Sequence, residues 1–294
     1  MNNKTFLPFV ALCLIWGSTW YFIKITLNAG MPPMYGVGIR FFFSGLLFFL
    51  ILLFRKESIP INKQSIKLYL SFALLNFSLS YGITYWATQY IYSSISAIIW
   101  GLFPAVTSLM AHFMIPNDPN ERLTQNKLLA LGIGFIGLTI IFSNQTIDFS
   151  SNSFIGILLL MCAVVAAAYP SVLYKKHSKE VNHYQMNAVC QLITGVVMLS
   201  LSYFIETEDT MQLVWTNELI LSTIYLIVLG GVVSWGIYFW LYQHLTVTQV
   251  TYVAIFPPIV AIIIGWIFLN EVLTIKEIIG TIFILSGSVL IYRK

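Results

Sequence analysis

The segment YGVGIRFFFSGLLFFLILLF, residues 35–54, is the clearest indication of the fold class of this chain. It is a run of twenty residues in which Arg40 is the only charged side chain. Because a helix of about 20 apolar residues crosses the hydrocarbon core of a bilayer, this run predicts a transmembrane helix. Arg55 and Lys56 follow directly and mark its end.

Similar runs fill the rest of the chain. Breaking the sequence at charged and turn-forming clusters leaves apolar stretches at 5–27, 35–54, 66–89, 93–115, 124–143, 153–175, 182–205, 217–242, 246–269 and 274–292. They are continuous rather than alternating, which favours helices over barrel strands. Of the 294 residues, 58% are hydrophobic and only 9% charged, against about 25% in a soluble domain. We therefore predict an all-α integral membrane protein of about ten transmembrane helices and exclude a soluble enzyme.

The distribution of Lys and Arg predicts the orientation, because these residues are retained on the cytoplasmic side. With the N-terminus inside, twelve of the fifteen lie in inner loops, Lys276 lies outside, and Lys24 and Arg40 lie within stretches. The net charge of +4 is thus a topology signal and does not indicate nucleic-acid binding. We expect a multi-pass protein of the cytoplasmic (inner) membrane with both termini cytoplasmic.

The sequence also contains an internal repeat. A shift of 150 residues aligns Gly45 with Gly195, Ala130 with Gly280 and Gly137 with Gly287, and a shift of 153 aligns Tyr85 with Tyr238 and Phe103-Pro104 with Phe256-Pro257. The change of shift is assigned to a three-residue insertion, Pro119 to Glu121. Residues 1–145 and 146–294 would then be two repeats of five helices, and an odd number inverts the second repeat in the membrane. Inverted repeats characterise secondary transporters.

Several motifs support a family resemblance: Trp16-Gly17-Ser18, Lys24, Pro32-Pro33 before Arg40, prolines in the fourth and ninth stretches, and Asn270-Glu271-Val272-Leu273-Thr274 followed by Gly280 and Gly287. With them the chain resembles the EamA-type branch of the drug/metabolite transporter superfamily over nearly its whole length. The resemblance implies ten helices in two inverted five-helix repeats, and export or uptake of small metabolites such as amino acids. The second repeat departs from the pattern, with Ala166-Ala167-Ala168 opposite Trp16-Gly17-Ser18 and Cys190 opposite Arg40.

The interiors of the predicted spans contain no Asp or Glu. Because charges inside a membrane are costly and usually functional, their absence disfavours an acidic proton relay or a cation-exchange site. A neutral or zwitterionic solute fits better. Lys24 and Arg40 are the two cations within the spans, and one or both are candidates to bind its carboxylate, Arg40 being the better one because it lies farther from its helix end. The alternative is snorkelling to the outer headgroups or capping of neighbouring helix ends.

Polar side chains recur every four residues in the third stretch, at Asn76, Ser80, Thr84 and Thr88. This helical face either lines a water-filled path or holds helices together. Proline breaks at corresponding places of two repeats point to a binding site, with simple helix packing as the alternative. The candidate substrate-binding residues are Trp16, Ser18, Arg40, Asn76, Ser80, Tyr81, Thr84, Trp100, Tyr169, Tyr238 and Tyr252, and the candidate hinges are Gly17, Pro104, Pro170, Pro257 and Pro258.

No Walker-type loop, zinc motif or GxSxG elbow occurs, so we expect no cofactor, no metal and no catalytic site. The leading hypothesis is a secondary transporter or facilitator that exports small organic metabolites such as amino acids by alternating access. Its partners would be the solute and membrane lipid, with a monomer or a homodimer left open. The alternatives are an intramembrane lipid-modifying enzyme, disfavoured by scattered histidines, and a non-catalytic membrane scaffold, disfavoured by short loops.

Overall fold

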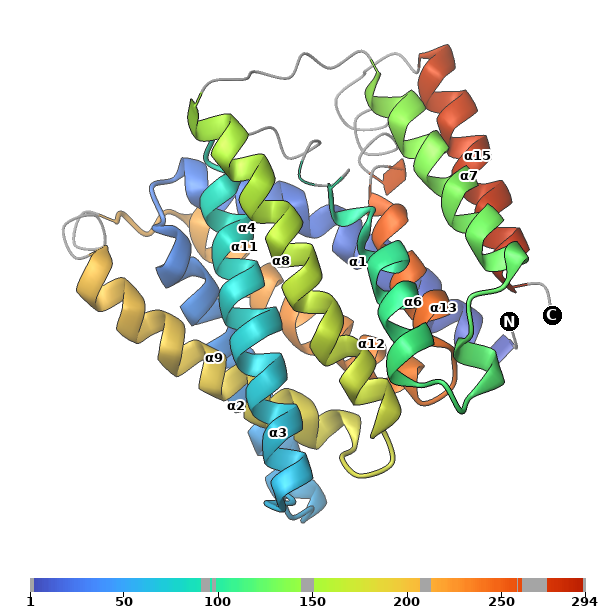
Figure 1. Ribbon diagram of the computed structural model, residues 1–294. Helices are drawn as coiled ribbons and strands as arrows, with labels where there is room; N and C mark the ends of the chain where they lie inside the picture. The colour runs from blue at the N-terminus through green and yellow to red at the C-terminus, as the bar shows by residue number, and fades with distance from the viewer. Residues whose placement is uncertain are drawn as a thin grey trace.

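The computed structural model describes residues 3–90, 96, 99–143, 151–206, 213–257, 259–260 and 274–292. Every regular element within these residues is helical (Figure 1). The α-helices are α1 (Asn3–Asn28), α2 (Pro33–Arg55), α3 (Lys63–Ser71), α4 (Tyr81–Ala87), α6 (Phe103–Met114), α7 (Gln125–Phe142), α8 (Ser151–Lys176), α9 (His183–Ile205), α11 (Asn217–Ile227), α12 (Ser234–Tyr242), α13 (Val247–Thr251) and α15 (Ile275–Tyr292). Two π-helical segments, η1 (Phe72–Ser80) and η3 (Val228–Val233), and two 3₁₀ segments, η2 (Pro119–Glu121) and η4 (Tyr252–Ile255), complete the set.

The prediction of an all-α membrane protein is confirmed. Seven helical segments of the described chain are long and apolar enough to cross a membrane, and they coincide with the first, second, third, fifth, sixth, seventh and eighth predicted stretches. The shorter apolar helices Phe103–Met114 and Ile278–Gly287 lie in the fourth and tenth. The ninth stretch contains α13 and η4 and is described as far as Val260. Helices thus lie in each predicted stretch, while the count of ten crossings stays a prediction.

Helix ends follow from local sequence signals. Asn182 caps α9, where its side chain accepts hydrogen bonds from the first turn and Gln185 completes a capping box. Thr246 and Gln249 form a second capping box at the start of α13. Pro32 precedes α2, and Lys56 ends it in the left-handed conformation, with φ of 55°. Polar caps at the ends of apolar runs therefore set where the spans begin and stop.

Helices α2 and α9 form the most extensive helix pair of the described residues, and they run antiparallel. The Glu206 carboxylate, just after α9, accepts hydrogen bonds from the backbone nitrogens of Met34 and Tyr35 at the start of α2. At the other end, the Asn182 amide at the start of α9 donates to the Glu57 carboxylate just after α2, at 2.7 Å. The end of each helix thus meets the beginning of its partner.

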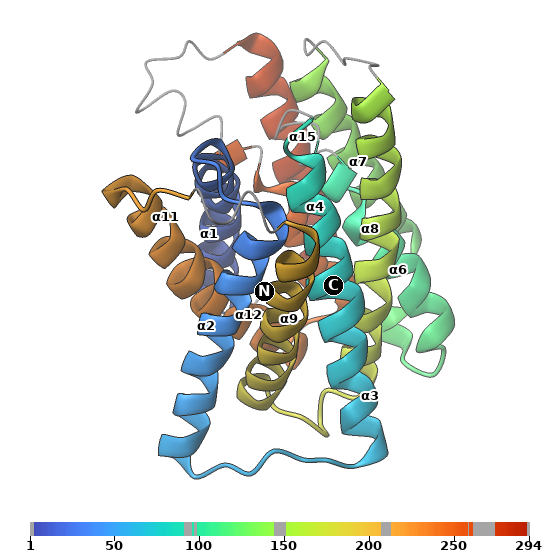
Figure 2. The same ribbon diagram turned by 90° about the vertical axis from the view of Figure 1, so that its left-hand side faces the viewer.

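Glycines allow this close approach, and they do so reciprocally. A Cβ on Gly45 of α2 would lie 2.6 Å from the backbone nitrogen of Leu192, and one on Gly195 of α9 would collide with the backbone of Phe42. Each residue of the first contact lies 150 positions from one of the second. Helices α7 and α15 pair in the same way, through Gly137 and the backbone of Gly280, and lie side by side in both views (Figure 1 and Figure 2).

The first helix of each half packs against helices of the other half. Helix α8 packs on η1, α4 and α6, while α1 packs on α11, α12 and η4. The π-helical segments also correspond, because η1 shifted by 153 residues covers 225–233, which contains η3. This exchange of partners is the packing that an inverted repeat requires.

Candidate functional site

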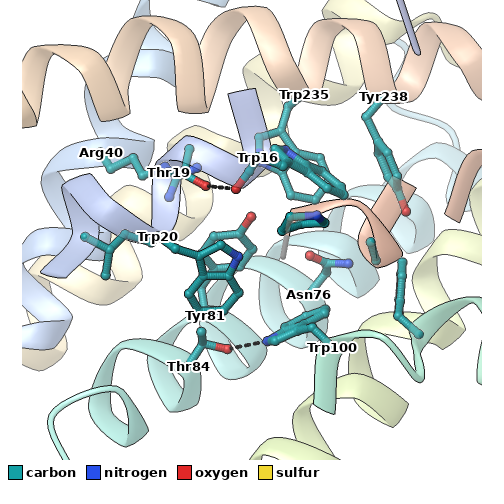
Figure 3. A pocket seen from close by; sticks show the side chains of 14 residues that line it. Trp16, Thr19, Trp20, Arg40, Asn76, Tyr81, Thr84, Trp100, Trp235 and Tyr238 are labelled. Atoms are coloured by element: carbon teal, nitrogen blue, oxygen red, sulfur yellow. Dashed lines mark hydrogen bonds between the residues drawn. The ribbon is translucent and has the colours of Figure 1, made fainter. Parts of the chain in front are cut away.

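A cavity lies among α1, α2, η1, α4, α6, α12 and η4. Of the fourteen described residues that line it, seven are aromatic and Arg40 is the single charged one. In Figure 3, Trp16, Trp235 and Tyr238 gather on one side, with Tyr81, Thr84 and Trp100 on the other. The lining is Trp16, Thr19, Trp20, Ile23, Arg40, Asn76, Tyr81, Thr84, Trp100, Phe103, Trp235, Tyr238, Ala254 and Pro257.

One face of α1 forms a wall of the cavity. Trp16, Thr19, Trp20 and Ile23 follow each other at intervals of three, one and three residues, which places them on the same side of a helix. The Trp16 ring lies 5.1 Å from the ring of Tyr238 and 5.4 Å from that of Trp235, both on α12. The aromatic lining therefore bridges the first helix of the chain and the eighth predicted stretch.

Arg40 lies in the interior of the protein, with only 2% of its surface exposed. Its Nη2 donates to the carbonyl oxygen of Gly230 at 2.7 Å and its Nη1 to the Tyr85 hydroxyl at 3.3 Å, while Nε has no hydrogen-bond partner among the residues that the structure describes. The ring of Tyr81 lies 5.2 Å from the guanidinium carbon. A buried Arg40 that lines a cavity does not snorkel to the headgroups.

No acidic side chain of the described residues forms an ion pair with Arg40. Among the described residues, the carbonyl and the hydroxyl that it contacts are neutral, so dipoles and aromatic faces are what stabilise its charge there. A buried charge without a counter-charge is costly, and in a membrane it usually marks a functional site. An anionic group that entered the cavity would therefore be attracted to Arg40.

The polar face of the third predicted stretch serves two purposes. Asn76 and Ser80 donate hydrogen bonds across to α8, to the carbonyl oxygens of Ala167 at 3.3 Å and Ala163 at 2.6 Å. Thr84 instead accepts a hydrogen bond from the Trp100 indole nitrogen at 3.2 Å, which orients that ring at the cavity wall. Both interpretations left open by the sequence thus apply, helix adhesion for Ser80 and cavity lining for Thr84. Asn76 does both.

Eight of the predicted site residues surround this one cavity: Trp16, Arg40, Asn76, Tyr81, Thr84, Trp100, Tyr238 and Pro257. Four others lie elsewhere. The Ser18 hydroxyl bonds to that of Tyr225, and Ser80 holds α8. The Tyr252 hydroxyl contacts α7, 3.3 Å from the carbonyl oxygen of Ala130, and Tyr169 is a half-buried residue packed against the main core.

The predicted hinges have different surroundings. Gly17 abuts Val260, so it serves a close helix contact. Pro104 lies buried in the first turn of α6, where a proline leaves no hydrogen bond unmade. Pro170 lies inside α8 and Pro257 at the cavity. Pro258 lies outside the described residues.

Six lining residues were not predicted: Thr19, Trp20, Ile23, Phe103, Trp235 and Ala254. Helical spacing from Trp16 would have found Thr19 and Trp20, and spacing from Tyr238 would have found Trp235. No pattern in the sequence indicates Ala254, because an alanine within an apolar run has no property that distinguishes it from its apolar neighbours.

Several proteins of similar sequence are named as transporters. The model of the EamA-like transporter family matches the chain twice, over residues 4–143 and 154–293. The uncharacterized transporter YoaV of Bacillus subtilis is 26% identical over 285 residues, which cover 97% of this chain and 95% of that protein. A Chlamydia muridarum protein named as an S-adenosylmethionine/S-adenosylhomocysteine transporter is 23% identical over 288 residues, with coverages of 95% and 89%.

The fold has a counterpart among solved structures. One crystal structure superposes with a TM-score of 0.80 over 99% of this chain and 97% of its own, at 14% identity. At that identity the likeness shows the fold alone. Since the family model covers both halves of the sequence, the chain belongs to the EamA-like transporter family and is a multi-pass membrane transporter for a small molecule.

Proposed function

We propose that this protein is a secondary transporter or facilitator that exports small organic metabolites with a carboxylate group, such as amino acids, across the cytoplasmic membrane. The solute is neutral or zwitterionic overall, and the cycle proceeds by alternating access. The observation that carries the proposal is Arg40, a buried cation at a cavity lined by aromatic side chains. Transport by this chain involves no catalytic step and no cofactor.

The chemistry of the cavity supports an amphipathic solute. A guanidinium presents N–H donors in a planar fork that matches a carboxylate. The aromatic rings and the side chains of Ile23 and Ala254 provide apolar surface for the rest of the molecule. The solutes in the name of the Chlamydia muridarum relative, S-adenosylmethionine and S-adenosylhomocysteine, combine an amino-acid carboxylate with an aromatic adenine ring. S-adenosylhomocysteine is zwitterionic and belongs to the same chemical class as the proposed solute, whereas S-adenosylmethionine carries an additional sulfonium charge.

Alternating access would proceed by motion between residues 1–145 and 146–294. The cavity supports this division, because its lining comes from both parts: Arg40 and Asn76 from the first, Trp235 and Tyr238 from the second. On the side where both termini are expected, Glu121 of the first part bonds to Val247 of the second. We interpret this contact as a sign that the transporter is closed on its cytoplasmic side.

The proposal is tested with purified protein in proteoliposomes. Uptake of a panel of radiolabelled amino acids is measured with and without an imposed pH gradient, for the wild type, Arg40→Ala and Arg55→Ala. Arg55 is the matched control, since it ends the same helix with its side chain 50% exposed. The direction is tested by comparing everted with right-side-out membrane vesicles.

Flux of particular amino acids that falls at least tenfold in Arg40→Ala but persists in Arg55→Ala supports the proposal. Equal flux in wild type and Arg40→Ala refutes the role of Arg40. If no amino acid is transported, the amino-acid preference is wrong and the search moves to sugars, nucleosides and drugs. Faster uptake into everted vesicles supports export, and the reverse contradicts it.

A further inference from the structure

The orientation of Arg40 depends on a residue 190 positions away. Its Nη2 bonds to the carbonyl oxygen of Gly230 at 2.7 Å, and Gly230 belongs to the π-helical segment η3. The same carbonyl accepts a hydrogen bond from the Ser234 hydroxyl, also at 2.7 Å. A π-helical turn interrupts the regular pairing of an α-helix, and such turns occur frequently at functional sites. Here the turn presents a backbone carbonyl to a buried cation.

A side chain at position 230 would crowd the guanidinium. A Cβ there would lie 3.0 Å from Nη2 of Arg40, 3.4 Å from its Cζ and 3.2 Å from the Thr19 methyl carbon. The contacts with Nη2 and the methyl carbon are tighter than ordinary van der Waals contact, so the guanidinium would have to shift by a few tenths of an ångström. Since Arg40 lines the cavity, its movement would change what the cavity can bind.

Tyr85 holds the guanidinium from another direction. Its hydroxyl accepts from Nη1 at 3.3 Å, and its side chain is almost completely buried, at 1% exposure. Gly230 and Tyr85 thus occupy two of the five N–H donors that a guanidinium carries. The remaining donors include the Nε–H, which has no hydrogen-bond partner within the described part of the chain.

We propose that Gly230 and Tyr85 are positioning residues that orient the Arg40 guanidinium so that its remaining donors bind the carboxylate of the transported solute. The inference rests on the proposed function, because it assumes that Arg40 is the carboxylate site. Arg40 lies in the proposed first part of the chain and Gly230 in the second. Motion between the two parts stretches the bond between them and reorients the guanidinium. Affinity for the carboxylate is then highest in the arrangement where Gly230 and Arg40 are in contact.

The experiment compares the transported amino acid with its carboxamide, which has the same side chain and lacks the carboxylate charge. KM and kcat for both are measured in proteoliposomes for the wild type, Gly230→Ala, Tyr85→Phe and Gly236→Ala. Gly236 on α12 is the matched control, because a Cβ there meets only the Phe48 ring at 3.5 Å or more, which is ordinary contact. Arg40→Ala shows the KM and kcat values for both solutes when the guanidinium is absent.

For Gly230→Ala we expect KM for the amino acid to rise about tenfold, the effect of losing one charge-assisted hydrogen bond. KM for the carboxamide and both kcat values stay within about twofold, because a carboxamide makes little use of the guanidinium charge. Tyr85→Phe adds no volume and removes one neutral acceptor, so a rise of about threefold in the same KM is expected. Gly236→Ala behaves as the wild type.

Two failures are distinguishable. If Arg40→Ala still prefers the amino acid over the carboxamide, the proposed function is wrong. If Arg40→Ala abolishes that preference while Gly230→Ala and Tyr85→Phe keep it, only the positioning role is refuted. Equal losses for amino acid and carboxamide in Gly230→Ala also refute it, because they indicate a packing defect. Should Gly230→Ala elute as an aggregate, Tyr85→Phe decides the question.

Discussion

Replacing Glu121 is expected to loosen one end of the protein. Glu121 follows α6 in the short segment η2, and only 1% of its side chain is exposed. Its two carboxylate oxygens accept from the backbone nitrogen of Val247 at 3.2 and 3.0 Å, and Lys175 Nζ lies 3.9 Å away. Lys175 in turn donates to the carbonyl oxygens of Tyr242 and Leu245, so one small cluster ties η2, the end of α8 and the turn between α12 and α13.

The magnitude follows from what each substitution leaves behind. Glu121→Ala leaves the Val247 N–H and the Lys175 ammonium without their anionic partner, and breaking a buried charge pair costs about 3–5 kcal/mol. Lys175 retains two carbonyl acceptors and is 19% exposed, which places the expected loss near the lower end, at about 3 kcal/mol. Glu121→Gln keeps a neutral acceptor for Val247, and we expect a loss of about 1 kcal/mol.

The assay is thermal unfolding of the purified protein in detergent. At about 2.1 cal/mol/K of unfolding entropy per residue, a loss of 1 kcal/mol lowers Tm by about 1.5–2 °C in a chain of 294 residues, so Glu121→Ala should melt about 5 °C below the wild type. Glu180→Ala is the control, since its side chain is 39% exposed and pairs with His177 at the surface. A Glu121→Ala variant that melts within 2 °C of both the wild type and Glu180→Ala would refute the reasoning.

Two further predictions concern helix packing and pH. Gly45→Ala and Gly195→Ala should each destabilise the protein by about 1–3 kcal/mol, because the added methyl group meets the facing helix, whereas Gly132→Ala, with no atom within 4 Å, should be neutral or stabilising. Equal thermal stability of the three variants would contradict this packing. The Arg55 guanidinium, helped by a hydrogen bond from Asn182, holds the pKa of Glu57 below its ordinary value of 4.5. The carboxylate therefore stabilises the protein at neutral pH, and that contribution disappears as the pH falls through the lowered pKa. The wild type should have a slightly higher Tm than Glu57→Gln at neutral pH, and this difference should vanish in acid. A difference in Tm that stays constant with pH would exclude the linkage.

Much of the fold follows from the sequence because its causes are local in the chain. An apolar run such as residues 35–54 has one stable solution in a bilayer, a helix whose backbone groups bond within the segment. The shift of 150 residues likewise anticipates the reciprocal contacts of Gly45 and Gly195. The resemblance to the EamA-type branch is confirmed by the family model over both halves.

Some of the predicted site residues lie away from the cavity, and the reason is the geometry of the helix. Ser18 and Trp16 are two residues apart, and so lie on different faces of α1, where Trp16 lines the cavity and Ser18 bonds to Tyr225. Sequence reasoning selected residues by type, without knowing which face of each helix turns inward. It also placed Glu121 in an insertion, although Asn120-Glu121 match Asn270-Glu271 at the shift of 150 residues and Glu121 is buried.

The membrane setting, the helical stretches and the internal repeat can be predicted from the amino-acid sequence, because hydropathy and glycine placement are properties of each helix taken separately. The contact between Arg40 and Gly230, and the gathering of eight predicted residues around one cavity, become visible when the helices are packed together. These contacts depend on how helices rotate and cross, and packing between distant segments sets those angles. The π-helical segment η3 is the clearest case, because the carbonyl it turns toward Arg40 belongs to a glycine that carries no sign of that role in the sequence.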